Sequence, residues 1–397
     1  MDTQVGHAEG GVRPSLASIR LNTPVSIVVP TFREVENIPG LIERVAAVRA
    51  AHDAEFELLF MDDDSGDGSV EAVEACGLDW VRMVVRRSDP GLSQSVIDGL
   101  RTAAHPVVVC MDCDLSHPPE RIPNLVLALE SGMQFAIGSR YVPGGSTDDD
   151  WGFFRWLNSR VATWMARPLT DAKDPMAGFF AMRKADFDQA RDLNPVGYKV
   201  ALELIVKCGV ENVGEVPIHF TDRVLGESKL SFRQQLLYIQ HLRRLYMFKF
   251  KTAMELLQFL VVGASGVVVN LVTLTVLSLM GASDLLALSG GLVVSVLTNF
   301  GFNRRFTFSY ARRGNMWKQM AGYFTVTAIA AVVNYVVAVA LLRTLLSEVR
   351  FGLQLAALAG IAVGMMFNFL GNRFYVFKTR QYKAAPPATE LAVGSEG

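Results

Sequence analysis

Four long segments without any charged residue lie in the second half of the chain, and they constrain its fold more than any other feature. They cover residues 256–280, 285–303, 319–342 and 351–372. Each is long enough to cross the hydrocarbon core of a bilayer, which takes about 20 helical residues. Buried helices of a large soluble protein are the alternative, but four such runs in succession argue against it. We therefore predict a four-span, all-α transmembrane domain over residues 254–380.

The first half of the chain has a different pattern, in which short apolar runs alternate with amphipathic segments. The apolar runs cover residues 25–29, 56–61, 81–85, 106–111 and 134–138. The amphipathic segments between them cover residues 36–50, 93–103 and 120–131. Strands buried on both faces of a sheet read as continuous apolar runs, and helices between strands indicate parallel pairing. We predict an α/β domain over residues 25–232 with a mostly parallel sheet.

Composition and charge distribution fit a membrane protein with this division. Charged residues make up 19% of the chain and the net charge is −1, which disfavours a nucleic-acid binder. Residues 1–24 lack the apolar core of a signal peptide and, like residues 381–397, are expected to be disordered. Lys and Arg gather before the first span, between the second and third, and after the fourth. The positive-inside rule then predicts a multi-pass protein of the cell membrane, with both termini and the α/β domain in the cytoplasm.

The membrane half contains an internal repeat. Spans two and four end in similar motifs, Asn299–Arg304 and Asn368–Arg373, and aromatic residues follow both. Spans one and three share an Asn, at Asn270 and Asn334. Two helical hairpins in the same orientation would give this pattern. Intramembrane Asn residues usually bond to neighbouring helices, so packing and a transport role both stay open for them.

Acidic residues follow two of the predicted strands. The strand 106–111 leads into Asp112 and Asp114, which point to the same side of an extended chain. Paired carboxylates at the end of a strand suit Mg²⁺ or Mn²⁺, usually completed by substrate phosphates. The strand 56–61 leads into Asp62 and Asp63, where ligands of open α/β sheets bind. Solvated turns and helix caps are the alternatives. The motifs of dinucleotide-binding dehydrogenases and P-loop NTPases are missing from the sequence.

Several motifs in the first half resemble those of dolichol-phosphate mannose synthase and its bacterial polyprenol-phosphate glycosyltransferase relatives. They begin at Pro30 (P-T-F-x-E), Asp62 (D-D), Asp112 (D-x-D-x-x-H-P-P-E), Gly138 (G-S-R-Y), Asp174 (D-P-x-x-G-F), Gly197 (G-Y-K) and Gly226 (G-x-S-K-L). The four-helix part looks like the small membrane domain often fused to such enzymes. The resemblance implies an inverting family 2 glycosyltransferase with a GT-A-type, Rossmann-like fold, which moves a sugar from a nucleotide diphosphate to a membrane polyprenyl phosphate.

The resemblance also implies roles for individual residues. The nucleotide-binding positions are Pro30, Phe32, Glu34, Asp62 and Asp63. The metal and diphosphate site, for Mg²⁺ or Mn²⁺, is formed by Asp112 and Asp114, with Ser116 where the family usually has a Gln. The acceptor-phosphate positions are Arg140, Arg155 and Ser159, with Arg223 and Lys229 in the acceptor loop. Catalysis is assigned to Asp112, Asp114, Arg140 and Arg155. The family's basic Gly-Leu-Gly stretch is altered here, so it supplies no identifiable lysine for the pyrophosphate.

Two segments are predicted to lie at the membrane surface. Residues 151–165 contain three tryptophans, and residues 232–250 mix apolar with basic side chains. Both patterns are typical of interfacial amphipathic helices, and an ordinary core-facing helix is the alternative. Residues 233–253 would then link the two domains. The four spans could anchor, oligomerise or translocate, and the sequence leaves this open.

The predicted activity is the transfer of a sugar to a dolichyl or polyprenyl monophosphate. GDP-mannose is the favoured donor, and UDP-glucose or another UDP-sugar is the alternative. A processive polysaccharide synthase is disfavoured, because the Q/R-x-x-R-W motif of those enzymes has Gly152 at its first position here. A lipid-linked sugar flippase or scaffold is the non-enzymatic alternative, and the intact carboxylates and arginines argue against it.

Overall fold

The computed structural model of the chain describes residues 20–147, 153–190, 192–194, 197, 199–221 and 232–378. The chain divides into two compact units, residues 1–249 and 250–397, and each is described here by itself. The predicted leader and tail lie almost entirely outside the described residues. Leu21 is an exception, because its side chain is buried in the core and its N–H bonds to the carbonyl of His52 at 3.2 Å.

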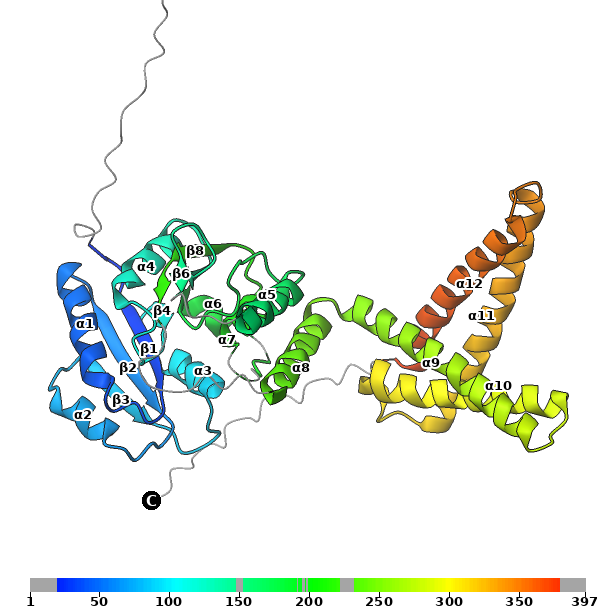
Figure 1. Cartoon of the computed structure of the whole chain (residues 1–397), viewed down its shortest axis with the longest axis horizontal. Coiled ribbons are helices and arrows are strands. Elements are labelled where there is room, and N and C mark those ends of the chain that lie inside the picture. Colours follow the sequence, from blue (N-terminus) through cyan, green and yellow to red (C-terminus); the bar gives the residue numbers. More distant parts are fainter. Residues whose placement is uncertain are drawn as a thin grey trace, which may run out of the picture. The chain divides into compact units, whose positions relative to one another are not determined.

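The first unit is built on a mixed sheet with helices packed against it (Figure 1). The sheet has seven strands in the order β3-β2-β1-β4-β7-β5-β8. Its strands are β1 Val25–Thr31, β2 Phe56–Asp62, β3 Val81–Val85, β4 Val107–Cys110, β5 Phe135–Ser139, β7 Phe180–Arg183 and β8 Val213–Pro217. β7 is antiparallel to both of its neighbours, and the other pairs are parallel. The predicted α/β fold with a mostly parallel sheet is confirmed, and each of the five predicted runs forms a strand. A small second sheet pairs β6 Ser146–Thr147 with β9 His219–Phe220.

Helices cover both faces of the large sheet. The helices of the unit are α1 Ile38–Ala51, α2 Ser69–Ala75, α3 Leu92–Thr102, α4 Ile122–Glu130 with a preceding 3₁₀ turn at Pro119–Arg121, α5 Phe153–Ala166, α6 Lys184–Asp188, α7 Val200–Lys207 and α8 Phe232–Lys249. Successive side chains of a strand point to opposite faces. Ile27 and Val29 accordingly pack with Leu41 of α1, whereas Val28 packs with Val96 of α3 in a separate cluster. The unit is thus a three-layer sandwich.

The strand order creates a crevice beside β1. The chain runs from β1 outward to β2 and β3, then crosses back to β4 on the other side of β1. α1 and α4, which follow β1 and β4, pack on the same face of the sheet. Ligands of open α/β sheets bind beyond the carboxyl ends of the strands, and here Pro30 of β1 and Asp112 after β4 line a small crevice at that edge. The register pairs Thr31 with Asp62 and Val28 with Cys110, so β1, β2 and β4 end at one edge. The loops after these strands carry the predicted acidic residues.

α8 has two apolar sides with different surroundings. Leu242 and Leu245 are buried in a cluster that includes Leu202 of α7. On the other side, Leu236 is 45% and Ile239 is 52% exposed. The core-facing alternative therefore holds for one side of α8, and the exposed side keeps the character expected of an interfacial helix.

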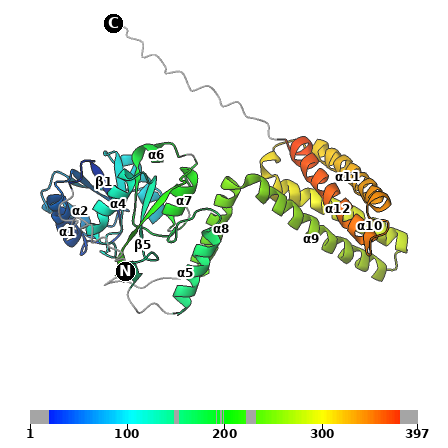
Figure 2. The ribbon, with the colours of Figure 1, turned by 90° about the horizontal axis from the view of Figure 1, so that it is seen from above.

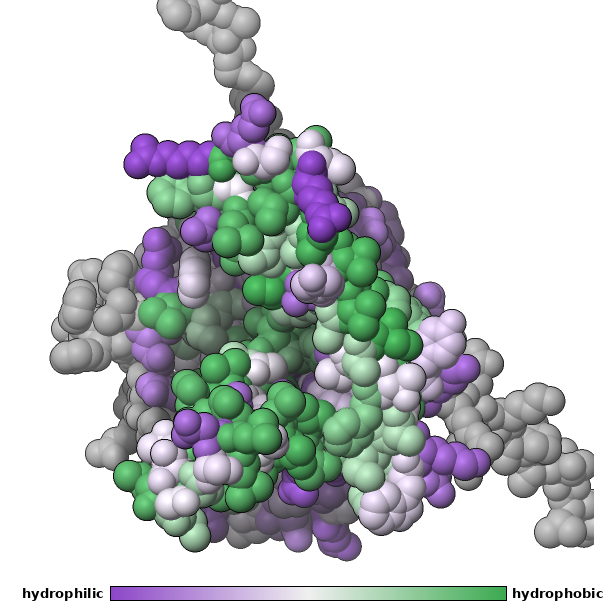
Figure 3. All heavy atoms as spheres, turned by 90° about the vertical axis from the view of Figure 1, so that its right-hand side faces the viewer, coloured by the Kyte–Doolittle hydropathy of each residue, from purple (hydrophilic) through white to green (hydrophobic). Residues whose placement is uncertain are grey.

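The second unit contains four helices that are long and apolar enough to cross a membrane, as predicted. They are α9 Lys251–Leu279, α10 Asp284–Phe302, α11 Met316–Thr344 and α12 Gly352–Gly371. α9 packs along α10 and α11 packs along α12, which gives two hairpins (Figure 2). Apolar side chains cover much of the outward surface of these helices (Figure 3). This surface suits contact with lipid chains.

Small residues let the helices of each hairpin approach closely. Gly291 of α10 lies against the Asn270 side chain of α9, where a Cβ would overlap it. A Cβ at Gly364 of α12 would lie 2.8 Å from the Cβ of Asn334 in α11. The two predicted intramembrane Asn residues therefore pack between helices. α10 and α12 each continue into a π-helical turn, η3 Asn303–Thr307 and η5 Asn372–Val376, which the sequence pattern did not predict.

Candidate active site

The loop after β1 presents an exposed aromatic ring. Phe32 is 55% exposed, although it follows a fully buried strand. Arg33 adopts a left-handed backbone conformation with φ of 61°, which turns the chain sharply. Beyond the turn, the Glu34 carboxylate accepts a hydrogen bond from Asn37 Nδ2 at 2.5 Å. An exposed ring at the crevice suits stacking against a base or a sugar.

The Asp62 side chain ties the loops after β1 and β2 together. It is buried, and its two oxygens accept from the N–H of Ser65 at 2.8 Å and from Ser65 Oγ at 2.5 Å. Ser65 Oγ in turn accepts from the N–H of Arg33 at 2.9 Å. Asp62 therefore holds the rim on which Phe32 is presented.

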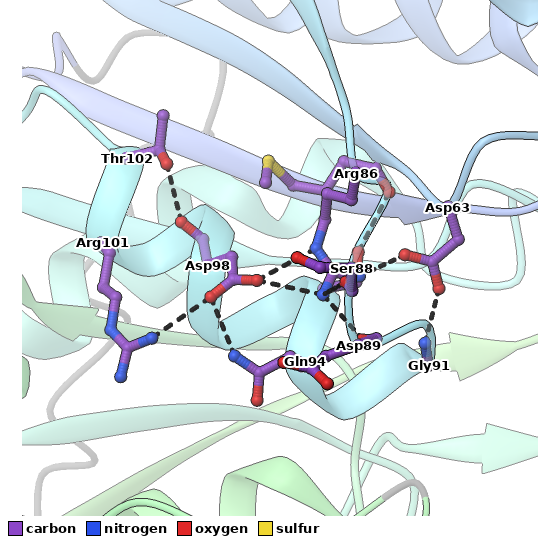
Figure 4. Close-up of polar contacts among 11 residues, drawn as sticks. Asp63, Arg86, Ser88, Asp89, Gly91, Gln94, Asp98, Arg101 and Thr102 are labelled. Carbon is purple, nitrogen blue, oxygen red and sulfur yellow. Dashed lines mark hydrogen bonds and ion pairs between the residues drawn. The ribbon is translucent and has the colours of Figure 1, made fainter.

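Asp63 belongs to a network that fixes the loop between β3 and α3 (Figure 4). Its carboxylate forms an ion pair with Arg86 and accepts from the N–H of Gly91 at 2.7 Å. Arg86 Nε donates to Asp98 at 3.0 Å, and Nη2 donates to the carbonyl of Asp89 at 3.0 Å. Both oxygens of Asp63 are thus engaged inside the protein. No sequence pattern predicted that Arg86 and Asp98 take part.

Asp112 and Asp114 follow β4 in a tight loop. The N–H of Asp112 donates to His117 Nδ1 at 3.0 Å, and the side chain of Asp112 is 29% exposed. Asp114 Oδ1 accepts from the N–H of Ser116 at 3.1 Å. The Ser116 hydroxyl is buried and has no hydrogen-bond partner within the part of the chain that the structure describes.

The buried side chain of His117 holds the backbone of this loop through its bond to the N–H of Asp112. Its ring stacks on Phe179 at 5.4 Å between centroids and meets the edge of Phe220 at 5.6 Å. Burial lowers the pKa of His117, although the charges of Asp112 and Asp114 act in the opposite direction. A neutral ring with Nδ1 as acceptor agrees with the bond from the Asp112 backbone. His117 lies within the motif that begins at Asp112, but no role was predicted for it.

A small cavity opens beside the Asp112 carboxylate. It is lined by Pro30, Asp112, Gly178 and Val200, among others. A Cβ at Gly178 would lie 3.5 Å from both carboxylate oxygens, so the glycine leaves the space next to them open.

The residues present fit a divalent cation that is completed by a substrate. Among the described residues, no group of three His, Cys, Asp or Glu side chains could hold a metal on its own. Mg²⁺ is commonly held by one or two carboxylates plus substrate phosphates and water. Two hard-oxygen carboxylates, one of them beside open space, agree with that mode of binding.

Arg140 is held at the end of β5 by Asp174. Its Nε and Nη2 donate to the two oxygens of Asp174 at 2.8 and 2.9 Å, and its backbone N–H donates to the same carboxylate at 3.2 Å. Burial alone would lower the pKa of Arg140, but the hydrogen bonds and charge of Asp174 raise it overall. Arg140 also lies 5.3 Å from the ring of Phe220, which contacts His117 on the Asp112 loop. Arg140 and the acidic loop therefore share a neighbour.

Lys199 is a further cation of this region. It immediately precedes α7, whose first residue Val200 lines the cavity beside Asp112. Burial and, to a smaller extent, the charge of Arg140 lower the pKa of Lys199 to about 8, while the charge of Asp174 acts in the opposite direction. Lys199 is the last residue of the quoted G-Y-K motif, which is the only sequence signal that could have identified it.

The structure does not describe the side chains of four residues that were predicted to bind the acceptor phosphate. Arg155 and Ser159 lie on α5, but their side chains are outside the described set. Arg223 and Lys229 lie outside the described residues altogether. The predicted residues that the structure brings to one region are those after β1, β2, β4 and β5.

Two family models match the chain, one in each unit. Residues 26–190 match "Glycosyl transferase family 2", and residues 258–377 match "GtrA/DPMS, transmembrane domain". The dolichol-phosphate mannosyltransferase of Pyrococcus furiosus is 34% identical over 360 residues, which cover 89% of this chain and 99% of that protein. That of Mycosarcoma maydis is 44% identical over 236 residues, 57% of this chain and 80% of the relative. The polyprenol monophosphomannose synthase of Mycolicibacterium smegmatis is 34% identical over 242 residues, 57% of this chain and 88% of the relative.

Proposed function

This chain belongs to the dolichol-phosphate mannosyltransferase family, and we propose that it transfers mannose from GDP-mannose, with inversion, to a dolichyl or polyprenyl monophosphate. The observation that carries the proposal is the similarity to a dolichol-phosphate mannosyltransferase over 99% of that relative's length. The chain is a glycosyltransferase with a GT-A-type catalytic domain and a transmembrane domain. The relatives' names favour mannose over the glucose alternative.

Asp112 and Asp114 hold Mg²⁺ or Mn²⁺ in this proposal, with the unpartnered hydroxyl of Ser116 as a further donor. When bound, the cation supplies positive charge for the leaving diphosphate. His117 fixes the backbone of Asp112 through Nδ1, and Gly178 keeps the space beside the carboxylate open for the diphosphate. The protein thus orients the carboxylates before the donor binds.

The nucleotide lies across the ends of β1 and β2. The exposed ring of Phe32 stacks on the nucleotide, and Pro30 and Glu34 flank it. Asp62 and Asp63 form the base of this site. Ser65 holds the carboxylate of Asp62, and the Arg86 network holds that of Asp63.

The acceptor phosphate binds to Arg140, Arg155 and Ser159, with Arg223 and Lys229 as further basic residues for the acceptor. Asp174 fixes the plane of the Arg140 guanidinium, and a fixed donor plane suits a phosphate oxygen. A phosphate monoester is largely a dianion at neutral pH. One of its oxygens forms the new bond to the anomeric carbon while the bond from that carbon to the nucleotide diphosphate breaks. No protein base is required.

The four spans anchor the enzyme in the cell membrane, with the catalytic unit and both termini in the cytoplasm. The exposed apolar residues of α8 and Trp164 of α5, which is 75% exposed, seat the catalytic unit at the bilayer surface. The lipid phosphate can then reach the arginines without leaving the headgroup layer.

Transfer of radiolabelled sugar to polyprenyl phosphate by the purified full-length protein tests the proposal. We expect label in the lipid with GDP-mannose but not with UDP-glucose, loss of transfer with EDTA, and recovery with Mn²⁺ or Mg²⁺. Asp114→Ala should abolish transfer, whereas Asp79→Ala, which removes an exposed carboxylate before β3, should not. Transfer from UDP-glucose but not from GDP-mannose would identify UDP-glucose as the donor. Tight nucleotide binding without any transfer would support a scaffold instead.

A further inference from the structure

The two hairpins of the membrane unit are related by a pseudo-two-fold arrangement that extends to side-chain contacts. Phe308 and Phe377, which follow η3 and η5, stack on each other at 4.8 Å and 17°. Around them the contacts occur in matching pairs. Phe259 meets Phe369 at 5.6 Å as Tyr323 meets Phe300 at 5.6 Å. Phe300 meets Phe377 at 6.2 Å as Phe369 meets Phe308 at 6.3 Å. Equivalent positions in the two hairpins therefore have equivalent surroundings.

One pair of equivalent positions breaks this symmetry in charge. Each π-helical turn carries an arginine, Arg304 in η3 and Arg373 in η5, which reaches the beginning of the first helix of a hairpin. Arg373 Nε forms an ion pair with Glu255 of α9 at 3.2 Å. Arg304 Nε donates instead to the neutral amide of Gln319 in α11, at 2.8 Å. Arg373 has a counter-charge, and Arg304 at the matching position has a neutral partner.

The remaining neighbours of Arg304 do not supply a negative charge either. Its Nη2 donates to the carbonyls of Arg312 at 2.6 Å and Gly314 at 3.3 Å. Nη1 has no hydrogen-bond partner within the part of the chain that the structure describes, and the side chain is partly exposed. The sequence contains no Asp or Glu between Asp284 and Glu348. The guanidinium keeps its charge in proteins, so Arg304 carries an uncompensated positive charge.

The surroundings of Arg304 suit the headgroup layer of a bilayer. Four further cations are exposed beside it in the sequence: Arg305, Arg312, Arg313 and Lys318. Trp317 is 67% and Phe306 is 48% exposed, and exposed aromatic rings are typical of the membrane–water interface. Basic sites at the ends of transmembrane helices attract anionic lipid headgroups.

We propose that Arg304 binds the headgroup phosphate of an anionic glycerophospholipid, with Nη1 facing the phosphate and the exposed cations of the connection between α10 and α11 around it. A phosphodiester carries one negative charge, which matches one uncompensated guanidinium. The acceptor monophosphate, a dianion, is assigned to the arginines of the first unit. The site would hold a structural lipid on the first hairpin only, because Glu255 neutralises the equivalent arginine of the second.

Native mass spectrometry of the full-length protein in detergent tests this, with phosphatidylglycerol and phosphatidylcholine as probes at equal concentrations. We expect the wild-type chain to prefer phosphatidylglycerol by about fivefold, the effect of about one basic residue near a lipid surface. Arg304→Gln should remove the preference. Gln319→Glu, which gives Arg304 the counter-charge that Arg373 has, should remove it as well. Arg343→Gln, which changes the net charge equally at the other end of α11, should keep it.

Each result decides between a lipid site and general surface charge. Arg304 also holds two loop carbonyls, so thermal unfolding is measured for every variant, and Gln319→Glu decides if Arg304→Gln does not fold. The proposal is overturned if wild-type protein does not prefer phosphatidylglycerol, or if folded Gln319→Glu keeps the preference. Displacement of phosphatidylglycerol by an equimolar amount of polyprenyl phosphate would assign the site to the acceptor instead.

Discussion

Replacing Asp174 by Asn should destabilise the catalytic unit strongly. Asp174 is fully buried, and its carboxylate accepts two side-chain hydrogen bonds from Arg140, whose side chain is only 14% exposed. The amide would keep one acceptor oxygen but no charge, and it would leave the guanidinium without its counter-charge. Removing one partner of a buried pair costs about 3–5 kcal/mol, and the retained oxygen puts the expected loss near the lower value. At about 2–4 °C per kcal/mol for a unit of this size, the unfolding midpoint should fall by about 6–12 °C.

Thermal unfolding of the full-length protein in detergent, followed by tryptophan fluorescence, measures this effect. Asp53→Asn is the matched control, since it removes the same charge from an ion pair with Arg20 whose side chains are 77% and 71% exposed. Exposed pairs contribute about 0–1 kcal/mol, so the control should lose at most a few degrees. If the two variants unfold at the same temperature, the reasoning about the buried pair is wrong.

Three further predictions concern the same unit. The positive charge of Lys199, next to the cavity beside Asp112, should favour binding of the anionic substrates. Because this charge is lost as the pH rises through its pKa of about 8, kcat/KM should fall there, and Lys199→Arg should move the decline to higher pH. Burial would raise the pKa of Glu203, but bonds from His241, Lys207 and a backbone N–H lower it to about 2, from 4.5 in the unfolded chain. Its stabilising effect is complete above pH 4.5 and lost as the pH falls toward 2, so Glu203→Gln should flatten the pH dependence of the urea midpoint in this range. Gly178→Ala should weaken nucleotide binding about tenfold in a titration, because its Cβ would lie 3.1 Å from the buried His117 ring and would fill the space 3.5 Å from the Asp112 oxygens.

The central strands could be predicted because one local signal dominates them. β1 and β2 are apolar at most positions and buried at all of them, and a short apolar run between turn residues is typical of a buried strand. β7 was not predicted. It has only four residues, and its antiparallel place between β4 and β5 is decided by pairing with strands far away in the sequence. Strand order is a tertiary property that no local pattern contains.

The site shows the same division between local and long-range information. The positions of Asp112 and Arg140 at strand ends follow from the strands themselves. Their partners do not, since Asp174 pairs with Arg140 and Arg86 pairs with Asp63 across separate loops. The role of His117 likewise depends on Phe179 and on burial.

α8 illustrates a different limit of sequence-based prediction. An apolar stripe on a helix reads the same whether it covers a protein core or a bilayer. Leu245 is fully buried and Ile239 is half exposed on the same helix. Only the packing of α8 against α7 separates the two uses.

The stacked rings of Phe308 and Phe377 affect how the membrane unit assembles. The two hairpins present equivalent aromatic residues to each other. If they were separate chains, the interface would form only after the two chains met by diffusion in the bilayer, so it would depend on their concentration. The short connection between α10 and α11 keeps the two hairpins at a high effective concentration regardless of how abundant the protein is. The two halves are then free to differ in sequence, so that Arg373 has an acidic partner in Glu255 while the equivalent Arg304 has a neutral partner in Gln319.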